Sequence, residues 1–327
     1  MADWPKSIHI HEEGPREGFQ FEKGQISTDS KVELIDALSQ TGLQEIQVVS
    51  FVNPKRVPGM ADADQVVEKF TKKPGVKYSG LWLNEQGLHR AIATHKIDVK
   101  GRMVLCASEP FLQRNQNSSL DQMVQGVRNM IGVYKQNGIA IEEGGVQAAF
   151  GCNFKGDIPV EDVLMIVHRI MSIAAENEIK LKNLVLADTM AWATPRKIRG
   201  VVGAVRERYP DLNITLHLHD TRGMGIANAY AGLEMGVHQF DSSVAGLGGC
   251  PFAAHKGAAG NVCTEDLVFM CEEMGIDTGV DLDKLIAAAN LAEEIVGHPL
   301  PGSVKQGGSL RVLRDKARAA ASTATTA

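Results

Sequence analysis

The chain has 327 residues, of which 44% are hydrophobic and 22% charged, and its formal net charge is −5. It has no lysine- or arginine-rich patch, no apolar signal segment and no apolar run near the roughly 18 residues that cross a bilayer. Composition therefore argues against nucleic-acid and membrane partners, and we expect a cytoplasmic protein. The five cysteines form no C-x-x-C pair, which argues against a disulfide framework and a thiolate zinc site.

Short apolar or alternating segments recur along the chain, and each is followed by a stretch with helical periodicity. Eight of these segments are predicted to be strands: residues 7–12, 45–51, 76–83, 98–107, 139–151, 181–188, 213–220 and 237–246. Strand-then-helix alternation at this spacing is typical of parallel β/α units. Eight units favour an α/β fold closed into a (β/α)8 TIM barrel over an open sheet.

One more helix is predicted beyond the eighth unit, over residues 282–297. We therefore expect residues 1–300 to form a single TIM-barrel catalytic domain that includes this C-terminal helix. Residues 301–327 end in a run of small and polar side chains and are expected to form a partly disordered extension.

Two histidines end the seventh predicted strand. His217 and His219 are two residues apart, so their side chains project from the same face of a strand. In a barrel, functional groups gather at the carboxyl ends of the strands, where two imidazoles suit a divalent metal completed by oxygen ligands. The alternative is a pair of hydrogen-bonded structural histidines, and spacing alone does not separate the two.

Arg16 and Glu17 lie in the segment that follows the first strand. A functional interpretation makes the guanidinium an oxyanion stabiliser beside a metal-binding carboxylate. The alternative is a solvated ion pair on a loop.

Four segments together resemble the 3-hydroxy-3-methylglutaryl-CoA lyase family, which belongs to a superfamily of metal-dependent TIM-barrel lyases and synthases. The segments are "SFVNPKRVPGMAD" (50–62), "HLHDTRGMGIAN" (217–228), "SSVAGLGGCPFA" (242–253) and "GNVCTEDLV" (260–268). The glycine-rich loop around Cys250 is the most specific, because it resembles the active-site signature of the lyases and not that of the synthases.

The resemblance implies a site and a reaction. It implies a divalent metal, Mg²⁺ or Mn²⁺, and retro-aldol (retro-Claisen) cleavage of a 3-hydroxy-3-substituted acyl-CoA substrate to acetyl-CoA and an oxo acid. It also implies a homo-oligomer, a dimer or a tetramer. The implied metal ligands are Glu17, His217, His219 and Asn261, the implied catalytic residues are Arg16, Glu17, Asp188 and Cys250, and the residues expected around the substrate or behind the ligands are Gln20, Gln47, Ser50, Trp192 and Arg222.

Several positions depart from the lyase pattern. Glu17 stands where the lyases have aspartate, and Gln47 stands where they have a glutamate. We expect the two changes to compensate, with the longer Glu17 side chain extending toward the space of the missing carboxylate. Met190 and Trp192 replace small residues, and Arg222 replaces a frequent tyrosine. These changes predict an altered acyl substituent.

Two other functions stay open at the level of sequence. A Claisen-type synthase that condenses acetyl-CoA with a 2-oxo acid is favoured by Glu17, because homocitrate synthases carry glutamate there. A non-catalytic barrel that only binds a metal or a partner is the other alternative, and retention of the candidate site residues argues against it.

Overall fold

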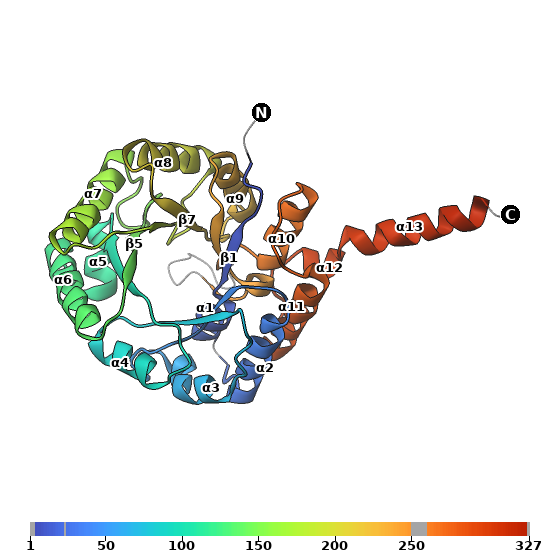
Figure 1. Ribbon diagram of the computed structural model, residues 1–327, viewed down its shortest axis with the longest axis horizontal. Coiled ribbons are helices and arrows are strands. Elements are labelled where there is room, and N and C mark those ends of the chain that lie inside the picture. Colours follow the sequence, from blue (N-terminus) through green and yellow to red (C-terminus); the bar gives the residue numbers. More distant parts are fainter. Residues whose placement is uncertain (1–3, 23, 250–259, 326–327) are drawn as a thin grey trace.

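The computed structural model describes residues 4–22, 24–249 and 260–325, and its centre is one eight-stranded sheet (Figure 1). The strands are β1 (His9–Glu12), β2 (Glu45–Ser50), β3 (Lys77–Leu81), β4 (Gly101–Cys106), β5 (Ile141–Gln147), β6 (Asn183–Ala187), β7 (Asn213–His217) and β8 (Gln239–Ser242). Every predicted strand is present, and each is shorter than its predicted segment. The sheet order is β3-β2-β1-β8-β7-β6-β5-β4, and all the pairs are parallel.

The first and last strands of the chain are neighbours in this sheet. β1 pairs with β8 so that His11 lies opposite Asp241, and β7 pairs with β8 so that His217 also lies opposite Asp241. Three strands far apart in sequence therefore place their carboxyl ends together.

Helices surround the strands as a ring (Figure 1). They are α1 (Gly14–Phe21), α2 (Thr28–Ser39), α3 (Ala63–Lys69), α4 (Glu85–Ala93), α5 (Glu109–Gln116), α6 (Leu120–Gln136), α7 (Val160–Glu176), α8 (Pro195–Arg208), α9 (Gly225–Glu234), α10 (Thr264–Glu273) and α11 (Leu282–Val296). Several begin at a side-chain cap; Ser27 and Thr194, for example, accept hydrogen bonds from backbone N–H groups of the first turn. The predicted helix over 282–297 is thus present as α11.

Helix α2 packs an apolar stripe against the sheet. In α2 the buried residues include Leu34, Ile35 and Leu38, which fall on one face of a 3.6-residue helix. Burying one such side chain stabilises the fold by roughly 1.5–3 kcal/mol. The main apolar core therefore lies between the sheet and the helices, and polar groups such as His11 and Asp241 occupy part of the sheet's inner face.

Helix α1 is a departure from the sequence analysis, which treated the segment after β1 as a loop. Pro15 occupies its first turn, where a fixed φ and a missing N–H favour helix initiation. The carboxylate of Glu12 anchors the turn by accepting the backbone N–H groups of Gly14 at 2.7 Å and Val244 at 2.9 Å. Arg16 and Glu17 consequently project from a helix that is fixed to the end of the sheet.

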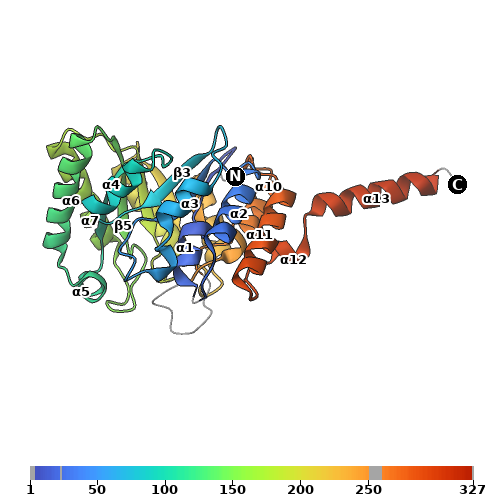
Figure 2. The same cartoon turned by 90° about the horizontal axis from the view of Figure 1, so that it is seen from below.

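Two further helices follow α11, namely α12 (Val304–Gly307) and α13 (Leu310–Thr325). Helix α13 covers a segment for which we expected little order, and its many alanines and arginines are strong helix formers. It extends away from the rest of the chain in both views (Figures 1 and 2). Among the helices in the described part of the chain, none combines the length and the apolar character that a membrane span needs.

Candidate metal centre

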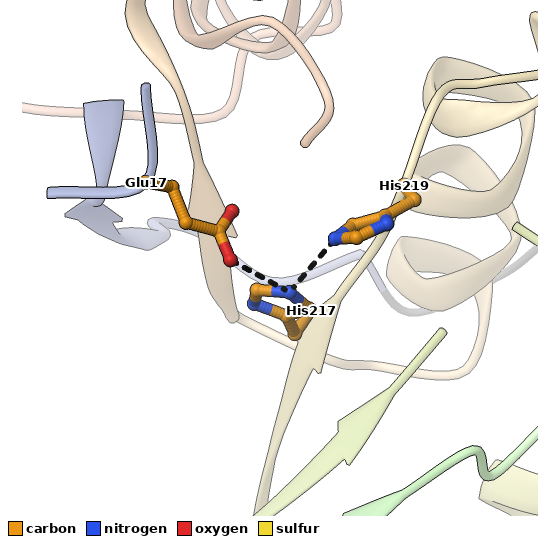
Figure 3. Close-up of side chains that lie close together, drawn as sticks. All are labelled: Glu17, His217 and His219. Carbon is orange, nitrogen blue, oxygen red and sulfur yellow. Dashed lines mark hydrogen bonds and ion pairs between the residues drawn. The ribbon is translucent and has the colours of Figure 1, made fainter. Parts of the chain in front are cut away.

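Three side chains converge at the carboxyl end of the sheet (Figure 3). His217 ends β7, His219 lies just beyond it, and Glu17 comes from α1. The Nε2 atoms of the two histidines are 3.2 Å apart, and His217 Nε2 is 4.0 Å from Glu17 Oε1. The candidate ligand atoms all lie within 4.8 Å of one another, which one small cation could span. The sequence-based expectation that both histidines face one point agrees with this geometry.

The other ring nitrogen of His217 faces carboxylates. His217 Nδ1 lies 3.0 Å from Asp241 Oδ2 and 3.3 Å from Glu13 Oε2. A proton on Nδ1 therefore has two acceptors, and Nε2 is the nitrogen turned toward Glu17 and His219. Burial would lower the pKa of His217, but the hydrogen bonds to Asp241 and Glu13 raise it well above its ordinary value. A metal at Nε2 must therefore displace a proton.

His219 has the opposite electrostatics. Burial, together with the charge of His217, lowers the pKa of His219 to about 3. Its imidazole is consequently neutral across the physiological range, and a neutral imidazole has a nitrogen lone pair to offer a metal. Nδ1 of His219 is buried and has no hydrogen-bond partner among the described residues.

Asn261 reaches the same place through an isolated β-bridge with His219. Its side chain is buried, and Nδ2 donates a hydrogen bond to Glu13 Oε2 at 3.4 Å. The amide oxygen Oδ1 is buried and lacks a hydrogen-bond partner within the described part of the chain. A buried carbonyl oxygen without a donor is costly unless a cation or water satisfies it, so Asn261 fits a metal ligand.

Arg16 is buried within a set of acceptors. Its Nη2 donates to Glu13 Oε2 at 2.9 Å, its Nη1 donates to Glu17 Oε1 at 3.0 Å, and its Nε donates to Gln47 Oε1. Burial opposes its charge, but Glu13 and Glu17 raise the pKa of Arg16 above its ordinary value. The guanidinium is thus a fixed positive charge beside the candidate metal ligands.

Gln47 and Glu17 contact the same guanidinium, and the compensation expected from the sequence stays a prediction. Gln47 Oε1 accepts a hydrogen bond from Arg16 Nε, while Glu17 Oε1 accepts one from Arg16 Nη1. The additional carboxylate at Arg16 is Glu13, which sequence analysis missed. Although burial raises the pKa of Glu13, the charges of Arg16 and His217 hold it well below the ordinary range, so Glu13 is an anion.

Asp241 was also missed. Asp241 is marked as a site residue by its position on β8, opposite both His217 and His11. That register exists only in the folded sheet and cannot be read from the sequence. Glu13 had a weak local signal, because it lies two residues beyond His11 and two apart is the repeat of one strand face.

Asp188 lies at the end of β6 and holds the following turn. Its Oδ1 accepts the backbone N–H groups of Trp192 at 2.7 Å and Ala193 at 2.9 Å. Its Oδ2 is buried and has no hydrogen-bond partner among the described residues, and burial raises the pKa of Asp188 to about 7. Trp192 in turn donates from Nε1 to Asn153 Oδ1 at 2.6 Å, which orients its ring.

The remaining predicted residues lie around this centre in two groups. Ser50, at the end of β2, donates to Gln20 of α1 at 3.1 Å. Arg222 donates to the carbonyl oxygens of Met190 at 3.1 Å and Ala191 at 2.9 Å, so it ties the turn after β7 to the turn after β6.

Cys250, the predicted catalytic thiol, lies outside the described residues. Two other cysteines behave as buried side chains. Burial raises the pKa of Cys271 to about 12 and that of Cys263 well above its ordinary value, which leaves both as unreactive thiols.

Comparison with known proteins decides the relationship. The sequence model of the HMGL-like family matches residues 7–292. The chain belongs to this family. Hydroxymethylglutaryl-CoA lyase of Bacillus subtilis (strain 168) is 37% identical over 298 residues, covering 91% of this chain and 96% of that enzyme. The mitochondrial enzyme of Pongo abelii is 38% identical over 306 residues, covering 94% of this chain and 91% of that enzyme.

Solved structures of HMGL-like proteins share the fold. The Bacillus subtilis HMG-CoA lyase superimposes with a TM-score of 0.85 at 36% identity, covering 93% of this chain and 98% of that structure. An HMG-CoA lyase from Acinetobacter baumannii, in complex with coenzyme A and 3-methylmalate, has a TM-score of 0.83 at 35% identity, covering 94% of this chain and 97% of that structure. The family resemblance drawn from the sequence motifs is confirmed.

Proposed function

We propose that this protein is a metal-dependent acyl-CoA lyase that cleaves a 3-hydroxy-3-substituted acyl-CoA to acetyl-CoA and an oxo acid. The observation that carries the proposal is the convergence of Glu17, His217 and His219 beside the buried Arg16. Asn261, which is bridged to His219 and has a buried oxygen without a partner among the described residues, supports it. The HMG-CoA lyases to which the chain is similar support the reaction class.

We also infer a closed (β/α)8 barrel. Between the two terminal strands of the sheet order, the backbone N–H of Asp98 donates to the carbonyl of Tyr78 at 2.7 Å. The Tyr78 N–H donates back to Asp98 Oδ2 at 2.8 Å, and Arg102 of β4 donates to the carbonyl of Gly80 in β3 at 3.4 Å. These contacts support closure between β3 and β4, which gathers all the β/α turns around one opening.

The donor set suits an oxygen-preferring divalent ion. Glu17, His217, His219 and Asn261 would hold it, and two imidazoles with a carboxylate and an amide oxygen match Mg²⁺ or Mn²⁺ better than a soft metal. When bound, the ion would supply Lewis-acid polarisation of the hydroxyl and carboxylate oxygens of the substrate.

Side chains of the protein would then stabilise the negative charge that develops on the substrate and would transfer protons. A base removes the proton of the 3-hydroxyl group, the C2–C3 bond breaks as the oxo acid forms, and its electron pair moves into the thioester enolate. The fixed charge of Arg16 binds the enolate oxygen. Return of a proton to C2 gives acetyl-CoA. Asp188, with a pKa near neutrality, and Cys250 are the proton carriers that we propose.

The acyl group is proposed only as a class. The relatives are named for hydroxymethylglutaryl-CoA, and the Acinetobacter structure holds coenzyme A with a methyl-substituted hydroxy diacid. Trp192 and Arg222, beside the site, are the residues that would adjust the pocket to a different 3-substituent. We further propose that the enzyme is cytoplasmic. We also propose that it acts as a homo-oligomer, a dimer or a tetramer, and analytical ultracentrifugation would test this oligomeric state.

The deciding experiment measures acetyl-CoA release from a panel of 3-hydroxy-3-substituted acyl-CoAs. The panel is run with Mn²⁺, with Mg²⁺ and after chelation, and His219→Ala serves as a variant lacking one ligand. We expect metal-dependent release that His219→Ala loses. Absence of cleavage from every thioester, or consumption of acetyl-CoA with 2-oxo acids instead, would contradict the proposal.

A further inference from the structure

One buried carboxylate contacts three members of the candidate site. Glu13 precedes α1, and its side chain is 6% exposed. A single atom, Glu13 Oε2, lies 2.9 Å from Arg16 Nη2, 3.3 Å from His217 Nδ1 and 3.4 Å from Asn261 Nδ2. All three partners are nitrogen groups able to donate, so the oxygen can accept from each.

We propose that Glu13 is a positioning residue that orients the arginine and two metal ligands together. The inference rests on the function proposed above and adds a residue to its machinery. Glu13 contacts His217 at Nδ1, whereas Nε2 is the nitrogen near His219 and Glu17, and it contacts Asn261 at Nδ2, which is not the candidate ligand atom.

The effect on Asn261 follows from amide geometry. An amide side chain can present either NH2 or oxygen to a neighbour, and the two orientations differ only by a flip. The anionic oxygen of Glu13 accepts from NH2 and repels the carbonyl, so it keeps Oδ1 on the branch of the amide that does not contact Glu13. Without this partner, the amide loses the contact that selects its orientation.

The effect on Arg16 concerns competition for Glu17. Arg16 shares its charge between Glu13 and Glu17, at 2.9 and 3.0 Å. If Glu13 becomes neutral, Glu17 is the remaining carboxylate at the guanidinium, and Glu17 is also the carboxylate that the metal needs. Neutralising Glu13 therefore weakens metal binding by two routes. His217 is affected least, since Asp241 accepts from the same nitrogen at 3.0 Å.

The test uses Glu13→Gln, which keeps the size of the side chain and removes its charge. Mn²⁺ affinity is measured by isothermal titration, and kcat and KM are measured at saturating Mn²⁺. We expect the Kd for Mn²⁺ to rise at least about tenfold, the range found when groups that orient metal ligands are removed. We also expect kcat to fall at least about tenfold while KM changes less than about threefold, because Arg16 acts on the enolate and not on the ground state.

A compensating variant separates positioning from mere packing. Gln47 already contacts Arg16 at Nε, so Glu13→Gln with Gln47→Glu returns a carboxylate to the guanidinium. We expect this double variant to recover most of kcat and only part of the Mn²⁺ affinity, because Asn261 stays without its partner. Glu45→Gln is the control: it neutralises a carboxylate at the amino end of β2, which contacts Lys100 and His9, and should leave both quantities unchanged.

The outcomes are distinct from those of the proposed function. Wild-type Mn²⁺ affinity and kcat in Glu13→Gln would overturn the positioning role, as would a double variant no better than the single one. If no thioester is cleaved by the wild type, the proposed function fails, and Mn²⁺ affinity still tests Glu13. If Glu13→Gln does not fold, Glu13→Asp takes its place: the side chain retracts by about 1.5 Å with its charge kept, and unchanged Mn²⁺ affinity would overturn the proposal.

Discussion

Replacing Asp188 with asparagine should make the protein more stable at alkaline pH while removing activity. The change keeps the oxygen that accepts the N–H groups of Trp192 and Ala193, so the turn after β6 is preserved. It replaces the buried, unpartnered oxygen Oδ2 with an NH2 group and removes the buried charge.

The magnitude follows from the pKa of Asp188, which burial raises from 3.8 to about 7. Because the pKa of Asp188 is higher in the folded than in the unfolded state, the protonated group stabilises the fold. This stabilisation is fully present below the unfolded pKa and is lost as the pH rises through the folded pKa. At 1.36 kcal/mol per pH unit, the folded wild type at pH 8 loses about 4 kcal/mol relative to its protonated state, and at pH 5 about 1.6 kcal/mol. The asparagine of the variant cannot ionise, so the stability difference between variant and wild type should grow by about 2–3 kcal/mol from pH 5 to pH 8.

Urea unfolding at both pH values measures this difference, and comparing the two cancels the cost of the new amide group. Acetyl-CoA release measured on the same samples should fall at least about a hundredfold if the proton of Asp188 takes part in the reaction. A stability difference that is the same at pH 5 and pH 8 would refute the argument from burial. A fully active Asp188→Asn enzyme would refute the catalytic role and leave Asp188 as the holder of its turn.

Other predictions test the metal site, the backbone and the thiol. His219→Ala should raise the Kd for Mn²⁺ at least about tenfold in isothermal titration, since among the described residues only Glu17 and His217 join it in a group able to hold an ion. Gly42→Ala should lower the free energy of unfolding, measured in urea, by about 1–3 kcal/mol more than Gly75→Ala. Both glycines have positive φ, but a Cβ at Gly42 would lie 2.3 Å from a backbone carbonyl oxygen, whereas a Cβ at Gly75 would have no atom within 4 Å. Cys250→Ser should lower turnover at least about a hundredfold with metal affinity unchanged, because serine is a far weaker acid. Cys271→Ser, at a buried thiol, is its control, and equal turnover in both variants would exclude a catalytic thiol.

The succession of strands and helices along this chain was accessible from sequence because its signals are local. Each strand and its helix form a contiguous segment of apolar periodicity, and the pair His217 and His219 depends only on the two-residue repeat of one strand. Helix α1 was missed because Gly14 and Pro15 follow β1 after a single residue, and such a pair usually marks a loop. The hydrogen bond from the distant Val244 to Glu12, which helps to anchor that turn, could not be seen in the sequence.

The part of the site that sequence did not reveal depends on pairing between distant strands. Glu13 matters because β1, β7 and β8 meet in one register, which brings residues more than two hundred positions apart within hydrogen-bond distance. Asp241 faces His217 for the same reason. Gln47 looked like a loss of charge in the sequence, and its role as an acceptor for Arg16 required knowing where α1 lies.

The pairing of β1 with β8 also has a consequence for the order in which the protein is built. Glu17 belongs to the first β/α unit, and His217 leaves the ribosome 200 residues later. Closing a loop of that length costs about 5 kcal/mol of chain entropy, so β1 can pair early with β2, but its second neighbour, β8, joins it only after nearly the whole sheet has been made. High-affinity metal binding therefore cannot help the nascent chain to fold, and in a refolding experiment its appearance should mark the moment at which the two ends of the sheet have joined.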